Sequence, residues 1–228
     1  MTDTVDTTTI QTDFDRLALL SSEGWDHNNH YHRFLLRQVP GHCRNALEIG
    51  CGTGAFARLL ARKAEYVLAL DLSPQMISLA RERSEQYMNI DFQVANVLSW
   101  EFLPEQFDCI VSIATLHHLP MQEMLTKLKP ALAPDGTLIV LDLYQARLSD
   151  LFIILIAIPV NLLLKFIKTG HIRESEAVRE AWAAHEEHDS YLTLVQLSDI
   201  CRGILPGVRV KRQLLWRYSL IWKKVPDS

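Results

Sequence analysis

The chain has 228 residues, of which 48% are hydrophobic and 22% are charged. It is long enough for one α/β domain, too short for two full ones, and too apolar for a disordered protein. The net charge of −4 argues against a dedicated nucleic-acid-binding domain, whose charge balance is normally basic. The cysteines form no CxxC pair and the N-terminus carries no signal-peptide pattern, so a reduced, cytoplasmic setting is expected.

Helical patterns alternate with short apolar runs along most of the chain. Residues 11–40 are predicted to form two short helices, the second of which ends before Pro40 and Gly41. Strands are then expected at 45–49, 66–70, 107–113 and 137–143, with a weaker one at 90–95, and helices at 54–63, 74–86 and 121–132. Near-continuous apolar strands separated by helices indicate a parallel sheet covered on both faces.

The C-terminal part has a different pattern. Two strand candidates, Val208–Leu215 and Tyr218–Lys223, follow each other so closely that only an antiparallel hairpin can join them. The predicted fold is therefore α/β: a Rossmann-like three-layer sandwich whose mostly parallel sheet ends in an antiparallel hairpin.

A glycine-rich loop joins the first strand to the helix that follows it. The segment Ala-Leu-Glu-Ile-Gly-Cys-Gly-Thr-Gly runs from Ala46 to Gly54, and its glycines allow a tight turn and close approach of backbone N–H groups to a ligand. The next strand ends at Asp71, where a carboxylate can accept hydrogen bonds from a ribose diol. The loop thus predicts a nucleoside-containing ligand.

The same loop also satisfies a dinucleotide fingerprint, with glycines at 50 and 52 and Ala55 in the third position. Three features argue against a nicotinamide cofactor. Glu48 places a carboxylate where it suits an ammonium group better than a pyrophosphate, no Tyr-x-x-x-Lys pair exists, and the terminal hairpin is foreign to a simple dinucleotide fold. An NAD(P)-dependent oxidoreductase and a non-catalytic binding protein remain open as alternatives.

The loop and its acids resemble the class I S-adenosylmethionine-dependent methyltransferases, in particular the small-molecule group with an E-x-G-x-G-x-G loop. The resemblance covers about Ala46 to Leu143. It implies a seven-stranded sheet and S-adenosylmethionine as the cofactor. It further implies these cofactor-binding residues: Glu48 for the amino-acid end, Gly50, Cys51, Gly52 and Gly54 along the methionine and ribose, Asp71 for the ribose, Leu72 and Met76 beside the adenine, Asn96 and Val97 for the adenine nitrogens, and Ala114 near the methionine ammonium group.

A second motif follows the fourth strand. Leu116-His117-His118-Leu119 resembles the LHHL version found in the family, and neither an Asn/Asp-Pro-Pro-Tyr motif nor a Pro-Cys dipeptide is present. Methyl transfer mainly requires alignment, together with a base when the acceptor carries a proton. His117 and His118 are the candidate catalytic residues because ligands bind at the carboxyl edge of such sheets.

Two further segments have candidate roles. The N-terminal segment around residues 27–32 is rich in histidine, but it has no partner at metal-ligand spacing, so no metal site is predicted. The resemblance instead implies an N-terminal lid, to which Asn28 and Tyr31 are assigned as substrate contacts, with a solvated helix face as the alternative. The apolar run Leu151–Leu164 is shorter than the roughly twenty residues that span a bilayer. This run is expected to form a cap helix packed on the sheet. The alternatives are a lipophilic substrate pocket, a homodimer contact and peripheral membrane docking.

These observations predict four parts: an N-terminal helical lid (1–40), an S-adenosylmethionine-binding core (41–147), a helical cap insertion (148–190), and a final helix with the hairpin (191–228). The expected function is methyl transfer to O, N or C of a small acceptor with hydrophobic character.

Overall fold

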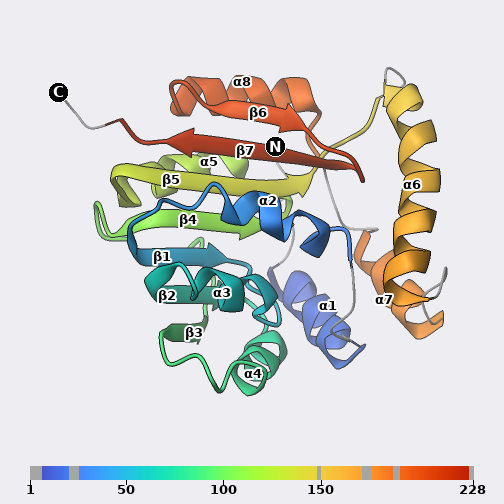
Figure 1. Cartoon of the computed structure of the whole chain (residues 1–228), viewed down its shortest axis with the longest axis horizontal. Coiled ribbons are helices and arrows are strands. Elements are labelled where there is room, and N and C mark those ends of the chain that lie inside the picture. The colour runs from blue at the N-terminus through green and yellow to red at the C-terminus, as the bar shows by residue number, and fades with distance from the viewer. Residues whose placement is uncertain (1–6, 21–25, 148–149, 171–175, 187–190, 226–228) are drawn as a thin grey trace.

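The computed structural model describes residues 7–20, 26–147, 150–170, 176–186 and 191–225. Seven strands form one sheet in the order β3-β2-β1-β4-β5-β7-β6 (Figure 1). Strands β1 to β5 pair in parallel, whereas β7 runs antiparallel between β5 and β6. The strands are β1 (Cys43–Ile49), β2 (Ala64–Asp71), β3 (Ile90–Val94), β4 (Phe107–Ile113), β5 (Leu132–Leu143), β6 (Arg209–Arg212) and β7 (Arg217–Lys223). The prediction of a seven-stranded α/β sandwich with a terminal hairpin is confirmed.

Helices cover both faces of the sheet and make the three layers. One face carries α2 (His32–Leu36), α3 (Ala55–Leu60) and α4 (Pro74–Glu82), and the other carries α5 (Met121–Ala131) and α8 (Leu194–Ile204). Successive strand residues alternate between the two faces, so Leu138 and Val140 of β5 join one core cluster while Ile139 and Leu141 join the other. Burial on both faces explains why the central strands are almost continuously apolar.

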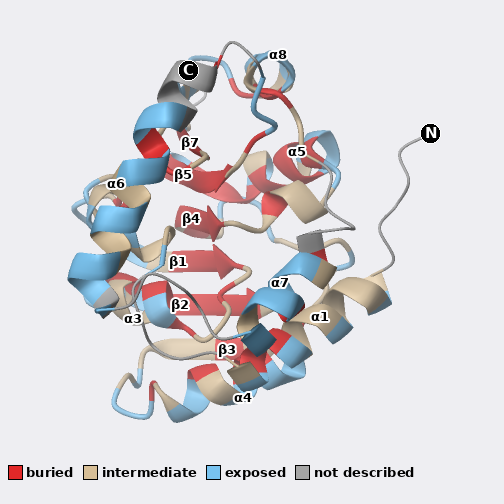
Figure 2. Ribbon diagram, turned by 90° about the vertical axis from the view of Figure 1, so that its right-hand side faces the viewer, coloured by how far each residue is buried: buried red, intermediate tan, exposed pale blue. Residues whose placement is uncertain are grey.

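The remaining helices stand at the edge toward which the parallel strands point. These are α1 (Thr7–Leu20), α6 (Leu151–Thr169) and α7 (Glu176–Glu186), and the 3₁₀ turns η1 (Asn29–Tyr31) and η2 (Leu116–His118) complete the described elements (Figures 1 and 2). Among the described residues α1 contacts α4 and α7. Ligands of open α/β sheets bind at this carboxyl edge, so these helices surround the place where a site is expected.

The helix α6 corrects one expectation from the sequence. It begins where the apolar run begins, but it continues through Pro159 to Thr169 and ends at Gly170, whose φ of 72° gives a left-handed cap. It does not bury its large apolar side chains on the sheet, because most of those that are described are exposed. A run of apolar residues predicts a helix but not the side on which that helix is covered. No helix in the described part of the chain has both the length and the apolar character needed to cross a membrane.

Candidate active site

The glycine loop lies directly after β1, and its three glycines have positive φ angles. The φ values are 70° at Gly50, 51° at Gly52 and 75° at Gly54, in the left-handed region that disfavours other residues. A Cβ atom at Gly50 would lie 2.0 Å from Oγ1 of Thr115, and one at Gly54 would lie 2.9 Å from the ring of Phe92. A Cβ at Gly52 would meet no atom within 4 Å. Packing therefore requires two of the glycines, and the space beside Gly52 is open to a ligand.

Four N–H groups of the loop are bonded within the protein, and that of Gly54 donates to the carbonyl oxygen of Cys51 at 2.9 Å. The N–H groups of Gly50 and Cys51 donate to the carbonyl oxygen of Leu70 at 2.8 and 3.0 Å. The N–H of Gly52 donates to Oδ2 of Asp71 at 2.8 Å. These bonds extend the β1–β2 pairing around the turn and satisfy the amides internally. The loop thus provides close approach and a fixed carboxylate rather than free donors.

Asp71 is held at the end of β2 by two backbone groups. In addition to the N–H of Gly52, the N–H of Ser73 donates to Oδ1 of Asp71 at 2.9 Å. The Ser73 side chain caps α4 by accepting from the N–H of Met76. Burial raises the pKa of Asp71, and the two N–H groups offset part of that rise. Each carboxylate oxygen keeps a further acceptor position, which is what a ribose diol requires.

Glu48 is the second acid of this region, and its side chain is only 2% exposed. Its Oε2 atom is buried and has no hydrogen-bond partner among the described residues. Burial, followed by the charge of Asp71, raises the pKa of Glu48 well above its ordinary value, although Arg58 opposes the shift. An orphaned buried carboxyl oxygen beside an open glycine is costly unless a cation completes it. The residues present therefore fit a ligand that carries an ammonium group and a ribose.

Three other residues expected around the cofactor differ in their burial and hydrogen bonding. Met76 is buried against Leu17 and Ala18 of α1, and Leu72 is partly exposed at the end of β2. Asn96 uses its Oδ1 to accept from the N–H of Leu98 at 3.0 Å.

Two more of the expected residues make backbone contacts. The carbonyl of Val97 accepts from Nζ of Lys127, and its side chain is buried in the core. Ala114 has a φ of 49°, and its N–H donates to the carbonyl of Leu141. A non-glycine residue in the left-handed region marks a strained turn, here at the carboxyl end of β4.

His117 forms a buried pair with Asp142, a residue that the sequence reasoning missed. Nδ1 of His117 lies 2.6 Å from Oδ1 of Asp142, and the N–H of His117 donates to Oδ2 at 3.0 Å. Burial tends to raise the pKa of Asp142, but the charge and hydrogen bond of His117 and the N–H of Leu143 outweigh it and hold the pKa below its ordinary value. An ionised carboxylate only accepts, so the proton of this bond is on Nδ1 of His117. The signal for Asp142 was an acid at the carboxyl end of an apolar strand.

His118 belongs to an aromatic cluster that joins three distant segments. Its ring centroid lies 3.8 Å from that of His117, 5.6 Å from Phe14 of α1 and 5.0 Å from His185 of α7. His185 in turn lies with Nδ1 3.3 Å from Oδ2 of Asp13. The structure therefore brings the two histidines of the motif together under α1 and α7. Phe14 and His185 gave no local signal, because their role depends on contacts across the chain.

Asn28 and Tyr31 lie beside β7 instead of forming an open lid. Oδ1 of Asn28 accepts from Nε of Arg217 at 2.9 Å, and the Tyr31 hydroxyl donates to the carbonyl of Leu214 at 2.8 Å. Desolvation raises the pKa of Tyr31 to about 12. Arg217 is buried at the start of β7, paired across the sheet with Leu143 next to Asp142. These contacts anchor the N-terminal segment, while α1 lies at the carboxyl edge together with α7.

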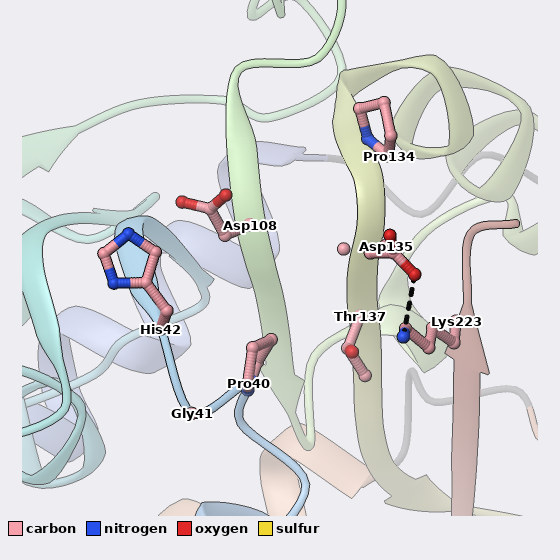
Figure 3. A pocket seen from close by; sticks show the side chains of 9 residues that line it. Pro40, Gly41, His42, Asp108, Pro134, Asp135, Thr137 and Lys223 are labelled. Atoms are coloured by element: carbon pink, nitrogen blue, oxygen red, sulfur yellow. Dashed lines mark ion pairs between the residues drawn. The ribbon is translucent and has the colours of Figure 1, made fainter. Parts of the chain in front are cut away.

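A hollow of about 400 Å³ opens at the opposite edge of the sheet. Its lining includes Gly41, His42 and Asp108, and Figure 3 shows Lys223 paired with Asp135 beside it at 2.8 Å. These residues lie before β1, in the first parts of β4 and β5, or at the end of β7, at the opposite ends of the strands from the glycine loop and the histidine pair. We therefore assign the chemistry to the carboxyl edge rather than to this hollow.

Comparisons with known proteins find related methyltransferases. A methyltransferase domain matches residues 46–136. An uncharacterised methyltransferase of Mycobacterium tuberculosis is 28% identical over 206 residues, covering 87% of this chain and 96% of the relative. A ubiquinone biosynthesis O-methyltransferase of Xanthomonas campestris is 29% identical over 149 residues, covering 56% and 59%. The crystal structure of the N-methyltransferase NodS from Bradyrhizobium japonicum, in complex with S-adenosylhomocysteine, has a TM-score of 0.64 at 18% identity and covers 96% of this chain and 100% of that one.

The fold, the glycine loop with its two acids, and the matched domain define a class I methyltransferase domain. The chain is an S-adenosylmethionine-dependent methyltransferase. The relatives and the solved structure named above are methyltransferases, which favours this class over a nicotinamide-dependent oxidoreductase.

Proposed function

We propose that this methyltransferase transfers a methyl group to an O, N or C atom of a small acceptor bound at the carboxyl edge of β4 and β5. The observation that carries the proposal is the convergence of two acid-containing sites at that edge. Glu48 and Asp71 form one, and the His117–Asp142 pair forms the other. The E-x-G-x-G-x-G loop and the LHHL motif of the small-molecule group support the same assignment.

Glu48 and Asp71 would hold the cofactor from its two ends. The orphaned Oε2 of Glu48 suits the ammonium group, and the fixed carboxylate of Asp71 suits the ribose hydroxyls. The space at Gly52 lets the ligand approach the backbone. The cofactor supplies an electrophilic methyl group on a sulfonium, and the protein supplies alignment and desolvation. Leu72, Met76, Asn96, Val97 and Ala114 remain proposed contacts of the adenine and methionine parts.

His117 is proposed as the general base. Its Nδ1–H is committed to Asp142, so Nε2 is the nitrogen that would take a proton from the acceptor. The buried Asp142 carboxylate would then stabilise the imidazolium that forms. His118, whose ring is tilted against that of His117, is proposed to shape the acceptor pocket with Phe14 and His185. It would serve as the base only if Asp142 has a purely structural role.

The acceptor is proposed to be a small molecule. The names of the relatives support this, since one is an O-methyltransferase of ubiquinone biosynthesis and another an N-methyltransferase. The net charge of −4 supports the exclusion of nucleic acid. A cytoplasmic location is proposed from the four free cysteines.

The division of the chain into parts is likewise proposed. It is a lid at 1–40, a cofactor core at 41–147, a cap at 148–190, and a closing helix and hairpin at 191–228. Within the lid, contacts of α1 with α4 and α7 support a covering role for α1, whereas Asn28 and Tyr31 would act on the substrate only through the position of Arg217. Contact with a membrane or with a second copy is proposed for the region 151–164.

The test is transfer of isotopically labelled methyl groups from S-adenosylmethionine into a metabolite extract. We expect a labelled small molecule with the native protein and a loss of about a hundredfold in its rate of formation with Asp142→Asn. His42→Ala is the matched control, because His42 is exposed beside the hollow at the opposite edge. Absence of any labelled product with the native protein would contradict the proposed function.

A further inference from the structure

The helix α6 exposes a continuous apolar face to solvent. Seven of its large apolar side chains are between 43% and 64% exposed, namely Leu155, Ile156, Ile158, Leu162, Leu163, Phe166 and Ile167. Figure 2 shows the helix at the margin of the molecule with most of its described surface exposed. These positions recur at intervals of three and four residues, so they lie on one side of the helix. We call this side the α6 face.

The opposite side of α6 carries the residues that contact the protein. Ala157 is buried, Leu164 packs against a core cluster, and Oδ1 of Asn161 lies 2.7 Å from Nε2 of His27. Helices on globular proteins normally turn their large apolar residues inward and their polar residues to water. Here the arrangement is reversed, since the one polar residue of the run points inward. The α6 face is therefore built for an apolar environment outside the molecule.

The charges of α6 favour an anionic environment as well. The helix contains Lys165 and Lys168 and no acidic residue. Asp150, which precedes it, forms an ion pair with Arg212 at 2.7 Å. Although the whole chain has a net charge of −4, the helix that carries the apolar face is thus positive. Lysine side chains at such a helix can extend to phosphate groups while their aliphatic stems stay apolar.

We propose that α6 docks the protein on an anionic membrane surface, lying in the plane of the interface with the α6 face in the acyl boundary. A helix with an exposed apolar side and basic residues outside that side binds at the headgroup level. Docking through a second copy is less suited to the charges, because two copies would gather four lysines without an acid on either helix. The helix α6 lies at the carboxyl edge of the sheet, the edge that also carries the candidate active site (Figure 1).

The experiment is co-sedimentation of the full chain with lipid vesicles, which requires no knowledge of the acceptor. Vesicles of phosphatidylcholine alone are compared with vesicles that also contain phosphatidylglycerol. Leu163→Glu is expected to lower the partition coefficient about tenfold or more, because it removes a large apolar side chain from the acyl boundary and places a carboxylate there. Leu103→Glu is the matched control, since Leu103 is also exposed but lies outside α6. Both side chains are exposed, so neither variant should change thermal stability.

The lysines are tested separately. Lys165→Gln and Lys168→Gln should each weaken binding to the anionic vesicles about fivefold and leave binding to neutral vesicles unchanged. Absence of vesicle binding by the native chain, or an equal loss with Leu103→Glu, would overturn the proposal. So would a dimer, measured by light scattering, that Leu163→Glu separates without any vesicle binding. Methyl transfer plays no part in these readouts, so their failure is distinct from failure of the proposed function.

Discussion

The cofactor side and the acceptor side of this site are assembled in different ways. On the cofactor side, Glu48, Gly52 and Asp71 belong to one β-loop-α-β stretch, and hydrogen bonds between neighbouring strands fix them. On the acceptor side, His117 and Asp142 come from the ends of two strands, and Phe14 and His185 come from opposite ends of the chain. The first arrangement is local and the second depends on tertiary packing. Variants on the cofactor side should therefore change ligand affinity, and variants on the acceptor side should change turnover.

The largest effect is expected at Gly52. Gly52→Val should make cofactor binding undetectable by calorimetry, because the branched side chain fills the open space and resists the φ of 51°. The free energy of unfolding should fall by only about 1–2 kcal/mol, the cost of left-handed backbone. Gly41→Val, at a glycine without a positive φ and with equal space, is the control that should bind normally. Normal binding by Gly52→Val would mean that the ligand lies elsewhere.

The second-largest effects are expected on the acceptor side of the site. His117→Ala and Asp142→Asn should each lower turnover about a hundredfold while the affinity for S-adenosylhomocysteine stays unchanged, because both residues act on the acceptor proton. His118→Ala should have a smaller effect, since Asp142 orients His117 and not its neighbour. Rates and calorimetric affinities are measured on the same preparations. If all three variants turned over as fast as the native protein, the His117–Asp142 pair would have a packing role only.

Asp71→Ala should weaken binding of S-adenosylmethionine by about 1–3 kcal/mol, because the ribose hydroxyls lose a charged acceptor. Asp91→Ala, on the neighbouring strand β3, controls for the loss of a carboxylate that takes no part in the site. Thermal denaturation must be measured alongside, since the N–H groups of Gly52 and Ser73 also lose their acceptor. Unchanged affinity in a folded Asp71→Ala protein would remove this residue from the cofactor site.

The smallest effect concerns the ligand-free protein. Because burial raises the pKa of Glu48 above its ordinary 4.5, its contribution to stability is fully present below pH 4.5 and is lost as the pH rises through the raised pKa. Glu48→Gln should therefore stabilise the ligand-free protein at neutral and alkaline pH by about 1 kcal/mol and weaken cofactor binding. Urea unfolding at several pH values measures the first effect. If the free energies of unfolding of the native protein and of Glu48→Gln differed by the same amount at every pH, burial would not raise the pKa of Glu48 as described.

The sequence predicted the cofactor side of the site better than the acceptor side. The strands, the glycine loop and Asp71 have periodic or local signals, and the structure contains them where they were expected. The His117–Asp142 pair could not be predicted, because pairing of β4 and β5 brings the two residues together. The inward position of Asn161 was also hidden, since an apolar run does not say which side of its helix meets the protein. The bond from the Tyr31 hydroxyl to the carbonyl of Leu214 was hidden as well, because the two residues are far apart in the sequence.

The measurement that tests the central claim most directly is calorimetric titration of the native chain with S-adenosylhomocysteine and, separately, with NADH. The glycine loop and Asp71 would suit either ligand, but the buried Glu48 suits only one that carries an ammonium group. Saturable binding of S-adenosylhomocysteine, weakened by Glu48→Gln, with no binding of NADH, is the predicted result. Binding of NADH without binding of S-adenosylhomocysteine would contradict the account.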